Sequence, residues 1–170
     1  MTTPLPPQPP QPPRPSQPPR PSQPLQVRRR ATGGETEIEL SLDVPSDLEY
    51  VGAAVELIAD ELPGGPLSPR RIRFNFRTAF AEALANAIAY GNSRDPGRLV
   101  RVRVEVARDA VRLHVTDEGN GFNPAGVPDP TLPERLERED GRGLFVLRSL
   151  VDHVAFNEKG NSVCLTLRAG

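Results

Sequence analysis

The sequence feature that most restricts the fold is a pair of adjacent segments, in each of which branched apolar residues alternate with polar ones. Their apolar faces consist of Val100, Val102, Val104 and Val106 in the first segment, and Val111, Leu113 and Val115 in the second. This alternation predicts two strands, and the tight turn at Arg108-Asp109 between them predicts an antiparallel hairpin. Because one face of this hairpin is apolar, it must be covered by another layer.

Patterns elsewhere supply that layer and further strands. We expect a strand over 38–44. A capping box at Ser46 to Glu49 predicts the start of a helix that ends near Leu62. A second helix is expected over 69–90, with Gly91 as its C-terminal cap. A third helix over 144–153 and a hairpin through residues 154–167 follow. The order β-α-α-β-β-α-β-β predicts an α/β (α+β) two-layer sandwich, with helices on one face of a mixed, mainly antiparallel sheet.

The N-terminal part has a different composition. Residues 1–24 hold 12 of the 21 prolines, so we expect residues 1–34 to be a disordered tail and residues 35–170 to be one domain. Five arginines and no acidic residue precede Glu35, which leaves a net charge of −6 on the domain and argues against direct nucleic-acid binding. Cys164 is the only cysteine, and no apolar run suits a membrane span or signal peptide, so we expect a cytoplasmic location.

The lysine content excludes two classes of phosphate site. Lys159 is the only lysine, and no glycine-rich Walker loop surrounds it. P-loop NTPases and ordinary protein kinases both place a lysine on the nucleotide phosphates. This chain therefore has neither of these two kinds of phosphate site.

The second predicted helix carries an isolated polar pair. From Thr78 to Ser93 the only charged residue is Glu82, and Asn86 lies one turn later on the same flank. A carboxylate facing a dry core is costly, so the pair should face a polar cavity, a cation or a ligand. Pairing of Glu82 with one of the arginines at 71, 73 and 77 is the alternative.

Two glycine-rich segments could complete a binding site. Asp117 leaves a strand and can accept a hydrogen bond from a ligand amine, and Gly119 and Gly121 allow close backbone approach. The segment from Gly141 to Leu144 precedes the third helix and resembles an anion site built from free backbone N–H groups. An ordinary turn and a flexible helix start are the respective alternatives.

Together these segments resemble the GHKL ATPases, whose ATP-binding domain is the Bergerat fold. The stretch EALANAIAYGN resembles their N box, DEGNG their G1 box and GRGL their G2 box, and the wording is similar to that of anti-sigma-factor serine kinases. The resemblance spans residues 35–168. The family often has histidine at the position of Tyr90, a departure that we expect to affect packing more than chemistry.

The resemblance implies ATP and Mg²⁺ as cofactors and a role for each residue. Glu82 would be the general base, Asn86 the Mg²⁺ ligand and Asp117 the reader of the adenine amino group. The remaining nucleotide-binding positions would be Gly119, Gly121, Gly141, Arg142, Gly143 and Leu144 around the phosphates and lid, and Thr166 near adenine. Residues 123–140 would form the ATP lid.

The resemblance also implies partners. The chain would be an ATP-dependent serine/threonine-protein kinase that phosphorylates a small anti-sigma antagonist, sequesters a sigma factor, or does both. A homodimer is compatible with the exposed sheet edges. An ATP-responsive switch that binds a partner and transfers nothing is the alternative, whereas a histidine-kinase core is disfavoured because the residues before Glu35 are proline-rich.

Overall fold

The computed structural model describes residues 25–121 and 139–170, with side chains from Gly143 onward in the second range. Its strands are β1 (Arg28–Ala31), β2 (Thr36–Pro45), β3 (Leu99–Ala107), β4 (Ala110–Thr116), β5 (His153–Phe156) and β6 (Ser162–Arg168). Its helices are α1 (Tyr50–Ala59), η1 (Arg71–Phe76), α2 (Arg77–Asn86), η2 (Ala87–Gly91) and α3 (Glu139–Leu150). The predicted two-layer α+β sandwich is confirmed.

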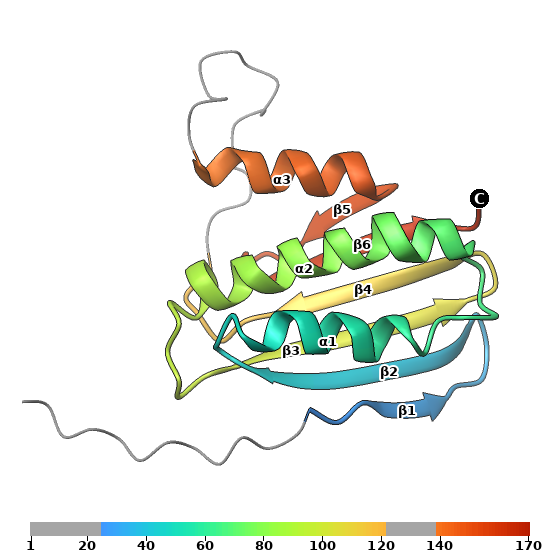
Figure 1. Ribbon diagram of the computed structural model, residues 1–170, viewed down its shortest axis with the longest axis horizontal. Helices are drawn as coiled ribbons and strands as arrows, with labels where there is room; N and C mark the ends of the chain where they lie inside the picture. The colour runs from blue at the N-terminus through green and yellow to red at the C-terminus, as the bar shows by residue number, and fades with distance from the viewer. Residues whose placement is uncertain (1–24, 122–138) are drawn as a thin grey trace, which may run out of the picture.

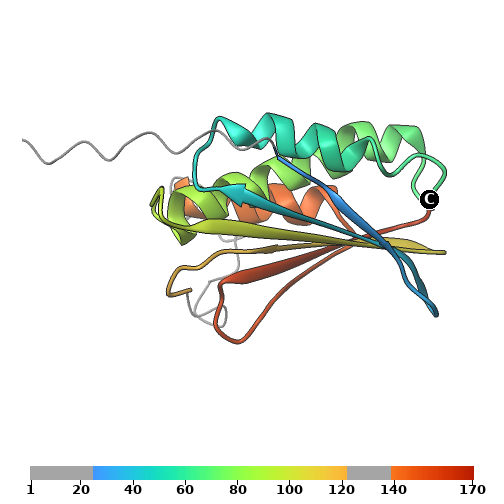
Figure 2. The same ribbon diagram turned by 90° about the horizontal axis from the view of Figure 1, so that it is seen from below.

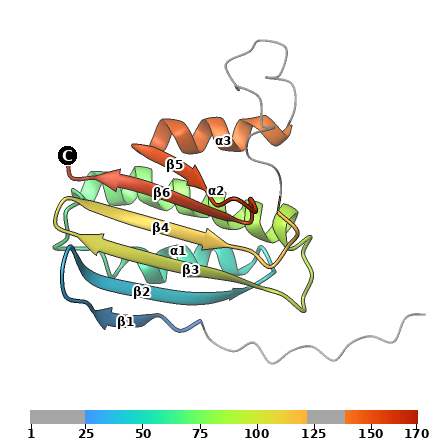
Figure 3. The same ribbon diagram turned by 180° about the vertical axis from the view of Figure 1, so that it is seen from behind.

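The strands form one sheet in the order β1-β2-β3-β4-β6-β5, and every neighbouring pair is antiparallel. The helices cover one face of this sheet (Figure 1), and the view from behind shows the other face uncovered (Figure 3). The turned view shows the same arrangement from below, with the helices on one side of a twisted sheet (Figure 2).

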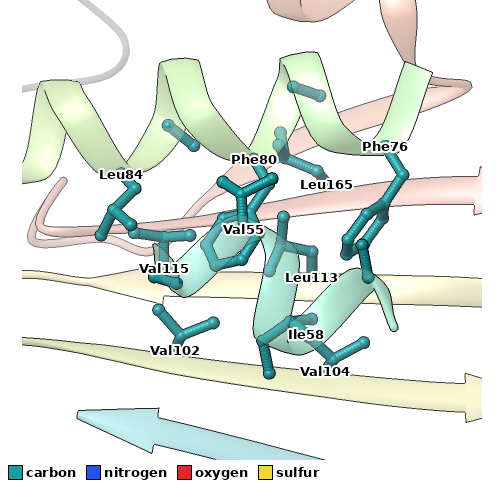
Figure 4. Close-up of a cluster of buried hydrophobic side chains, with 14 of the residues drawn as sticks. Val55, Ile58, Phe76, Phe80, Leu84, Val102, Val104, Leu113, Val115 and Leu165 are labelled. Atoms are coloured by element: carbon teal, nitrogen blue, oxygen red, sulfur yellow. The ribbon is translucent and has the colours of Figure 1, made fainter. Parts of the chain in front are cut away.

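The core lies between the two layers, and the alternating strand pattern builds its floor. Side chains of α1, η1 and α2 point toward Val102, Val104, Leu113, Val115 and Leu165 of the sheet (Figure 4). The helix stripe expected from the sequence is buried in full: Ile72, Phe76, Phe80, Leu84, Ala87 and Ile88. The rings of Phe76 and Phe80 are tilted, with centroids 5.9 Å apart, a favourable aromatic geometry.

The long central helix is not uniformly α-helical. It runs as η1, α2 and η2, so that π-helical turns flank the α-helical part on both sides. At its end the Asn92 backbone N–H donates to the Ala87 carbonyl oxygen five residues earlier, at 2.8 Å. Such π turns shift the side chains that follow them relative to an α-helix, and they occur frequently at functional sites.

Several sequence-based boundaries are wrong. Residues 28–31, assigned to the tail, form β1, which pairs antiparallel with β2 from Arg28↔Ser41 to Ala31↔Ile38. Exposed side-chain bonds accompany this pairing, from Arg28 to Ser41 and Asp43 and from Arg29 to Glu61. Residues 1–24 lie outside the described part of the chain, as do residues 122–138 of the predicted lid.

The predicted capping box does not form. The Ser46 hydroxyl donates to the Arg98 carbonyl oxygen and accepts from Asn92, while the Asp47 side chain accepts from the Glu49 backbone N–H instead. The third helix begins at Glu139 rather than near residue 144 and ends at Leu150. No helix among the described residues is both long and apolar enough to cross a membrane.

Candidate functional site

The polar pair of the central helix is the first element of the site. The Asn86 side-chain amide donates to Glu82 Oε1 at 3.0 Å, and both side chains are half-buried. Arg71 pairs with Asp152, and Arg77 pairs with two acidic residues of α1 and its C-terminal cap, Glu56 and Asp60. Among the described side chains no arginine pairs with Glu82, so the alternative that an arginine neutralises this carboxylate is not supported.

Helix α3 approaches this pair at a glycine. A Cβ atom built on Gly143 would collide with Glu82 Oε1 and would lie 3.1 Å from the Asn86 side-chain nitrogen. Glycine at this position therefore allows α3 to approach the pair closely. Leu144 follows as a half-buried residue, while the side chain of Arg142 lies outside the described set.

The conformation of this glycine-rich segment differs from the expected loop. Gly141, Arg142 and Gly143 all lie inside α3, which starts at Glu139. In an α-helix the backbone N–H of Gly143 faces the carbonyl oxygen of residue 139, four positions earlier. The structure thus brings this segment to Glu82 and Asn86, but in helical form.

The second element is the loop after β4. The Gly119 backbone N–H donates to Asp117 Oδ1 at 2.8 Å. The end of η2 lies directly against this loop, because a Cβ on Gly91 would collide with the Asp117 carboxyl group. A Cβ on Gly119 would in turn collide with the Gly91 carbonyl oxygen and come within 2.8 Å of Asp117 Oδ1. The two segments meet only because both residues are glycine.

Burial is the main influence on the Asp117 carboxyl group and raises its pKa above the usual value. The Gly119 N–H and then the Lys159 ammonium act in the opposite direction and favour the carboxylate. A half-buried carboxylate with a raised pKa is typical of a ligand-binding position.

Asn92 fixes the geometry of this junction, although no sequence pattern indicated a separate role for it. Its side chain is fully buried; Nδ2 donates to Ser46 Oγ at 2.8 Å and to the Leu99 carbonyl oxygen at 3.0 Å. Its Oδ1 accepts from the Glu118 backbone N–H at 2.7 Å. One buried amide thus connects the end of the central helix, the start of β3 and the loop that carries Asp117.

The turn between β5 and β6 supports the same loop from the other side. Asp117 exchanges two hydrogen bonds with Asn161: its N–H donates to the Asn161 carbonyl oxygen at 2.9 Å, and its own carbonyl oxygen accepts from the Asn161 side chain at 2.8 Å. Gly121 has φ +73°, and a Cβ there would collide with the Lys159 carbonyl oxygen. The single lysine therefore lies beside the predicted base-binding loop, a proximity that no local sequence pattern indicated.

Thr166 is not brought to this site. Its neighbours Leu165 and Leu167 are buried in the core, so its side chain points to the uncovered face of the sheet. In the β4–β6 pairing it lies four residues beyond Ser162, which pairs with Thr116 at the site end, a separation of roughly 13 Å. This placement does not support a role for Thr166 near adenine.

The site could hold a divalent cation only with help from a ligand. No cluster of three His, Cys, Asp or Glu side chains suited to a metal exists among the described residues. Since the amide nitrogen of Asn86 is directed to Glu82, the amide oxygen is the atom of this side chain that could face a cation. A hard ion such as Mg²⁺ commonly takes one or two protein oxygens and completes its shell with phosphate and water, so these residues fit that ion.

Comparison with known proteins agrees with this arrangement. A family model described as the histidine kinase-like ATPase domain matches residues 44–167. The serine-protein kinase RsbW of Oceanobacillus iheyensis is 25% identical over 126 residues, which cover 71% of this chain and 79% of the relative.

Two further relatives match over shorter stretches. The anti-sigma F factor of Geobacillus thermodenitrificans is 33% identical over 88 residues, 50% of this chain and 60% of the relative. The serine-protein kinase RsbW of Staphylococcus aureus is 28% identical over 99 residues, 53% of this chain and 62% of the relative. The matched part thus spans less than two thirds of these two proteins.

The fold agrees with a family match over more than two thirds of the chain. So do the contact of Gly143 with the Glu82–Asn86 pair and that of Gly91, at the end of the same helix, with Asp117. The implied ligand is ATP. The chain belongs to the histidine kinase-like ATPase (GHKL) family and is distantly related to RsbW serine-protein kinases and anti-sigma F factors.

Proposed function

We propose that this protein is an ATP- and Mg²⁺-dependent serine/threonine-protein kinase that phosphorylates a small anti-sigma antagonist, and that it also binds a sigma factor. The observation that carries the proposal is Glu82, a half-buried carboxylate that no described arginine neutralises and that lies beside Asn86 and Gly143. The names of the relatives, a serine-protein kinase and an anti-sigma factor, support the choice of partners. A cytoplasmic location follows from these partners.

In this proposal the nucleotide lies along the flank of the central helix. Asp117 accepts a hydrogen bond from the exocyclic amine of adenine. Glycine at 119 and at 121 lets the loop that carries Asp117 pack closely against Gly91 and Lys159, and this packing holds the carboxylate in place. The phosphates lie toward Asn86 and the start of α3, where the residues assigned to them are Gly141, Arg142, Gly143 and Leu144. Asn86 directs its amide oxygen to the cation.

Asn86, together with the nucleotide, would hold Mg²⁺, which would supply positive charge to offset the negative charge of the phosphates. Glu82 Oε accepts the proton of the substrate hydroxyl as its oxygen forms a bond to the γ-phosphorus. The bond from the γ-phosphorus to the β–γ bridging oxygen breaks, and ADP leaves with that oxygen. Asn86 orients Glu82 through their hydrogen bond of 3.0 Å.

The second candidate is a nucleotide-responsive switch that binds its partner without phosphotransfer. The same pocket would serve both functions, and the contact between α3 and Glu82 supplies a route by which nucleotide could reposition a helix. Retention of Glu82, which a pure switch does not require, favours the kinase.

Transfer of labelled γ-phosphate from ATP to a candidate antagonist protein tests the choice. We expect Glu82→Gln to bind ATP as the wild type does and to lose at least about a hundredfold in transfer rate, the range of a lost general base. Glu49→Gln is the matched control, since Glu49 is exposed on the neighbouring α1 side of the fold. Unchanged transfer in Glu82→Gln would rule out the base, and an unlabelled antagonist that still binds in the presence of ATP would favour the switch.

A further inference from the structure

The first turns of the central helix carry a concentration of positive charge. Residues 62–81 contain four arginines and no acidic residue. Two of these arginines, Arg71 and Arg77, form salt bridges with acidic side chains from other parts of the fold. The other two, Arg70 and Arg73, are exposed, and neither forms a salt bridge with any residue that the structure describes.

An exposed aromatic ring lies beside these two unpaired arginines. Phe74 directly follows Arg73, and 58% of its surface is accessible. Arg70 precedes Phe74 by four residues, about one helical turn, so the two side chains lie on the same side of the helix. We refer to the surface formed by Arg70, Arg73 and Phe74 as the arginine–phenylalanine patch. Arginine and phenylalanine are both enriched in protein–protein interfaces.

An open cavity of about 370 Å³ adjoins this patch, between η1 and the C-terminal end of α3. Arg70 lines the cavity together with Arg71 and residues 149–152. The one acidic side chain of this lining, Asp152, already accepts hydrogen bonds from Arg71 Nη2 at 2.6 Å and from the Arg168 backbone N–H at 2.8 Å. Because this carboxylate is already bonded, it leaves the charge of Arg70 available to a partner.

The arginine–phenylalanine patch is remote from the proposed nucleotide site. The central helix runs from Arg71 to Gly91 across the helical layer (Figure 1), and Gly91 packs against the Asp117 carboxyl group. At 1.5 Å per residue, the two ends of this helix are roughly 30 Å apart. A ligand on the patch therefore does not touch a nucleotide at Asp117, and the patch needs a function of its own.

We propose that the arginine–phenylalanine patch is a docking surface for an acidic segment of a partner protein, with carboxylates on Arg70 and Arg73 and an apolar side chain on Phe74. Guanidinium groups bind carboxylates through charge-assisted hydrogen bonds, often two in parallel. A nucleic acid fits less well, because the two unpaired arginines span a single helical turn and the domain carries a net charge of −6, which repels a long phosphate backbone. The inference does not depend on the proposed kinase activity.

Fluorescence anisotropy with defined labelled peptides tests this inference. The probe is a synthetic peptide of repeated Asp-Glu-Leu units, and two comparison peptides replace either its acidic residues by Asn and Gln or its leucines by Ser. We expect the acidic peptide to bind, the neutral peptide not to bind, and the dissociation constant to rise with salt, which screens exposed charges. Replacement of the leucines should weaken binding to the wild type more than to Phe74→Ser, because only the wild type has the ring.

Charge reversal locates the binding surface. Arg70→Glu combined with Arg73→Glu should raise the dissociation constant of the acidic peptide by about tenfold or more, because two attractive contacts become repulsive. Arg94→Glu is the matched control, since Arg94 is exposed, forms no salt bridge among the described residues and lies beyond the other end of the helix. Both variants should keep the wild-type Tm, which shows that the fold is intact.

The possible results separate this inference from the proposed function. Equal affinity of the wild type and the double variant for the acidic peptide, or no binding of that peptide by the wild type, overturns the inference. Tighter binding of single-stranded oligothymidylate than of the acidic peptide, lost in the double variant, would show that the patch recognises phosphate and would also overturn it. Failure of the wild type to bind ATP refutes the proposed function and leaves the docking surface standing.

Discussion

Replacement of Asn92 by alanine should destabilise the whole fold, although Asn92 touches no substrate in the proposed mechanism. The side chain is 0% exposed and makes three hydrogen bonds, to Ser46 Oγ, to the Leu99 carbonyl oxygen and from the Glu118 N–H. Asn92→Ala leaves a backbone acceptor and a backbone donor without these partners. Ser46 keeps its own bond to the Arg98 carbonyl oxygen.

The magnitude follows from these contacts. The lost bond to Ser46 costs about 1 kcal/mol, and each of the two partly buried backbone groups left unpaired costs roughly 1–2 kcal/mol, so we expect a total loss of about 3–5 kcal/mol. This is a large fraction of a typical unfolding free energy of about 5–15 kcal/mol. The Tm should fall by on the order of 10 °C.

Urea unfolding followed by circular dichroism measures this loss. Asn75→Ala is a suitable comparison, because the half-buried Asn75 makes one side-chain bond, to the Leu150 carbonyl oxygen at 2.8 Å, and should cost about 1 kcal/mol. A loss below about 1 kcal/mol for Asn92→Ala, or equal losses for both variants, would refute the reasoning.

Two further predictions follow from the geometry and the pKa shifts. Gly119→Ala should abolish ATP binding in calorimetry, because its Cβ would collide with the Gly91 carbonyl oxygen, whereas Gly52→Ala, with no atom within 4 Å, should bind normally. Burial, followed by the charge of Arg103, lowers the pKa of His114 below its usual 6.5. The folded protein therefore binds this proton less readily than the unfolded chain, so the unfolding free energy should fall as the pH drops through 6.5, and less so in His114→Gln. An NMR titration midpoint of His114 at or above 6.5 would contradict this sign.

Strands in which apolar and polar residues alternate regularly were predictable from the sequence. The alternation in β2, β3, β4 and β6 is confirmed because each strand has one face on the core. The strand β1 was missed because all four of its residues are exposed, so burial imposes no alternation on Arg28-Arg29-Arg30-Ala31. It is held by antiparallel backbone pairing with β2, which no local apolar pattern indicates.

The candidate site was predictable as a set of motifs but not as an arrangement. Glu82 and Asn86 lie together because helical spacing requires it, whereas the approach of Gly143 and of Gly91 depends on how α3 and η2 pack. Ser46 has the features of a helix cap, yet its hydroxyl accepts a hydrogen bond from Asn92, 46 residues later in the chain. The placement of Thr166 depends on the register of β6, which puts Leu165 and Leu167 on the core side.

The central claim is that Asp117, Asn86 and Glu82 together form an ATP site, and calorimetry with ATP in the presence and absence of Mg²⁺ tests it most directly. We expect Mg²⁺-dependent binding by the wild type and its loss in Asp117→Asn, whose neutral amide oxygen is a weaker acceptor for the adenine amine than the carboxylate and whose amide nitrogen can only donate. Binding that Asp117→Asn leaves intact, or no binding of ATP by the wild type, would contradict the account.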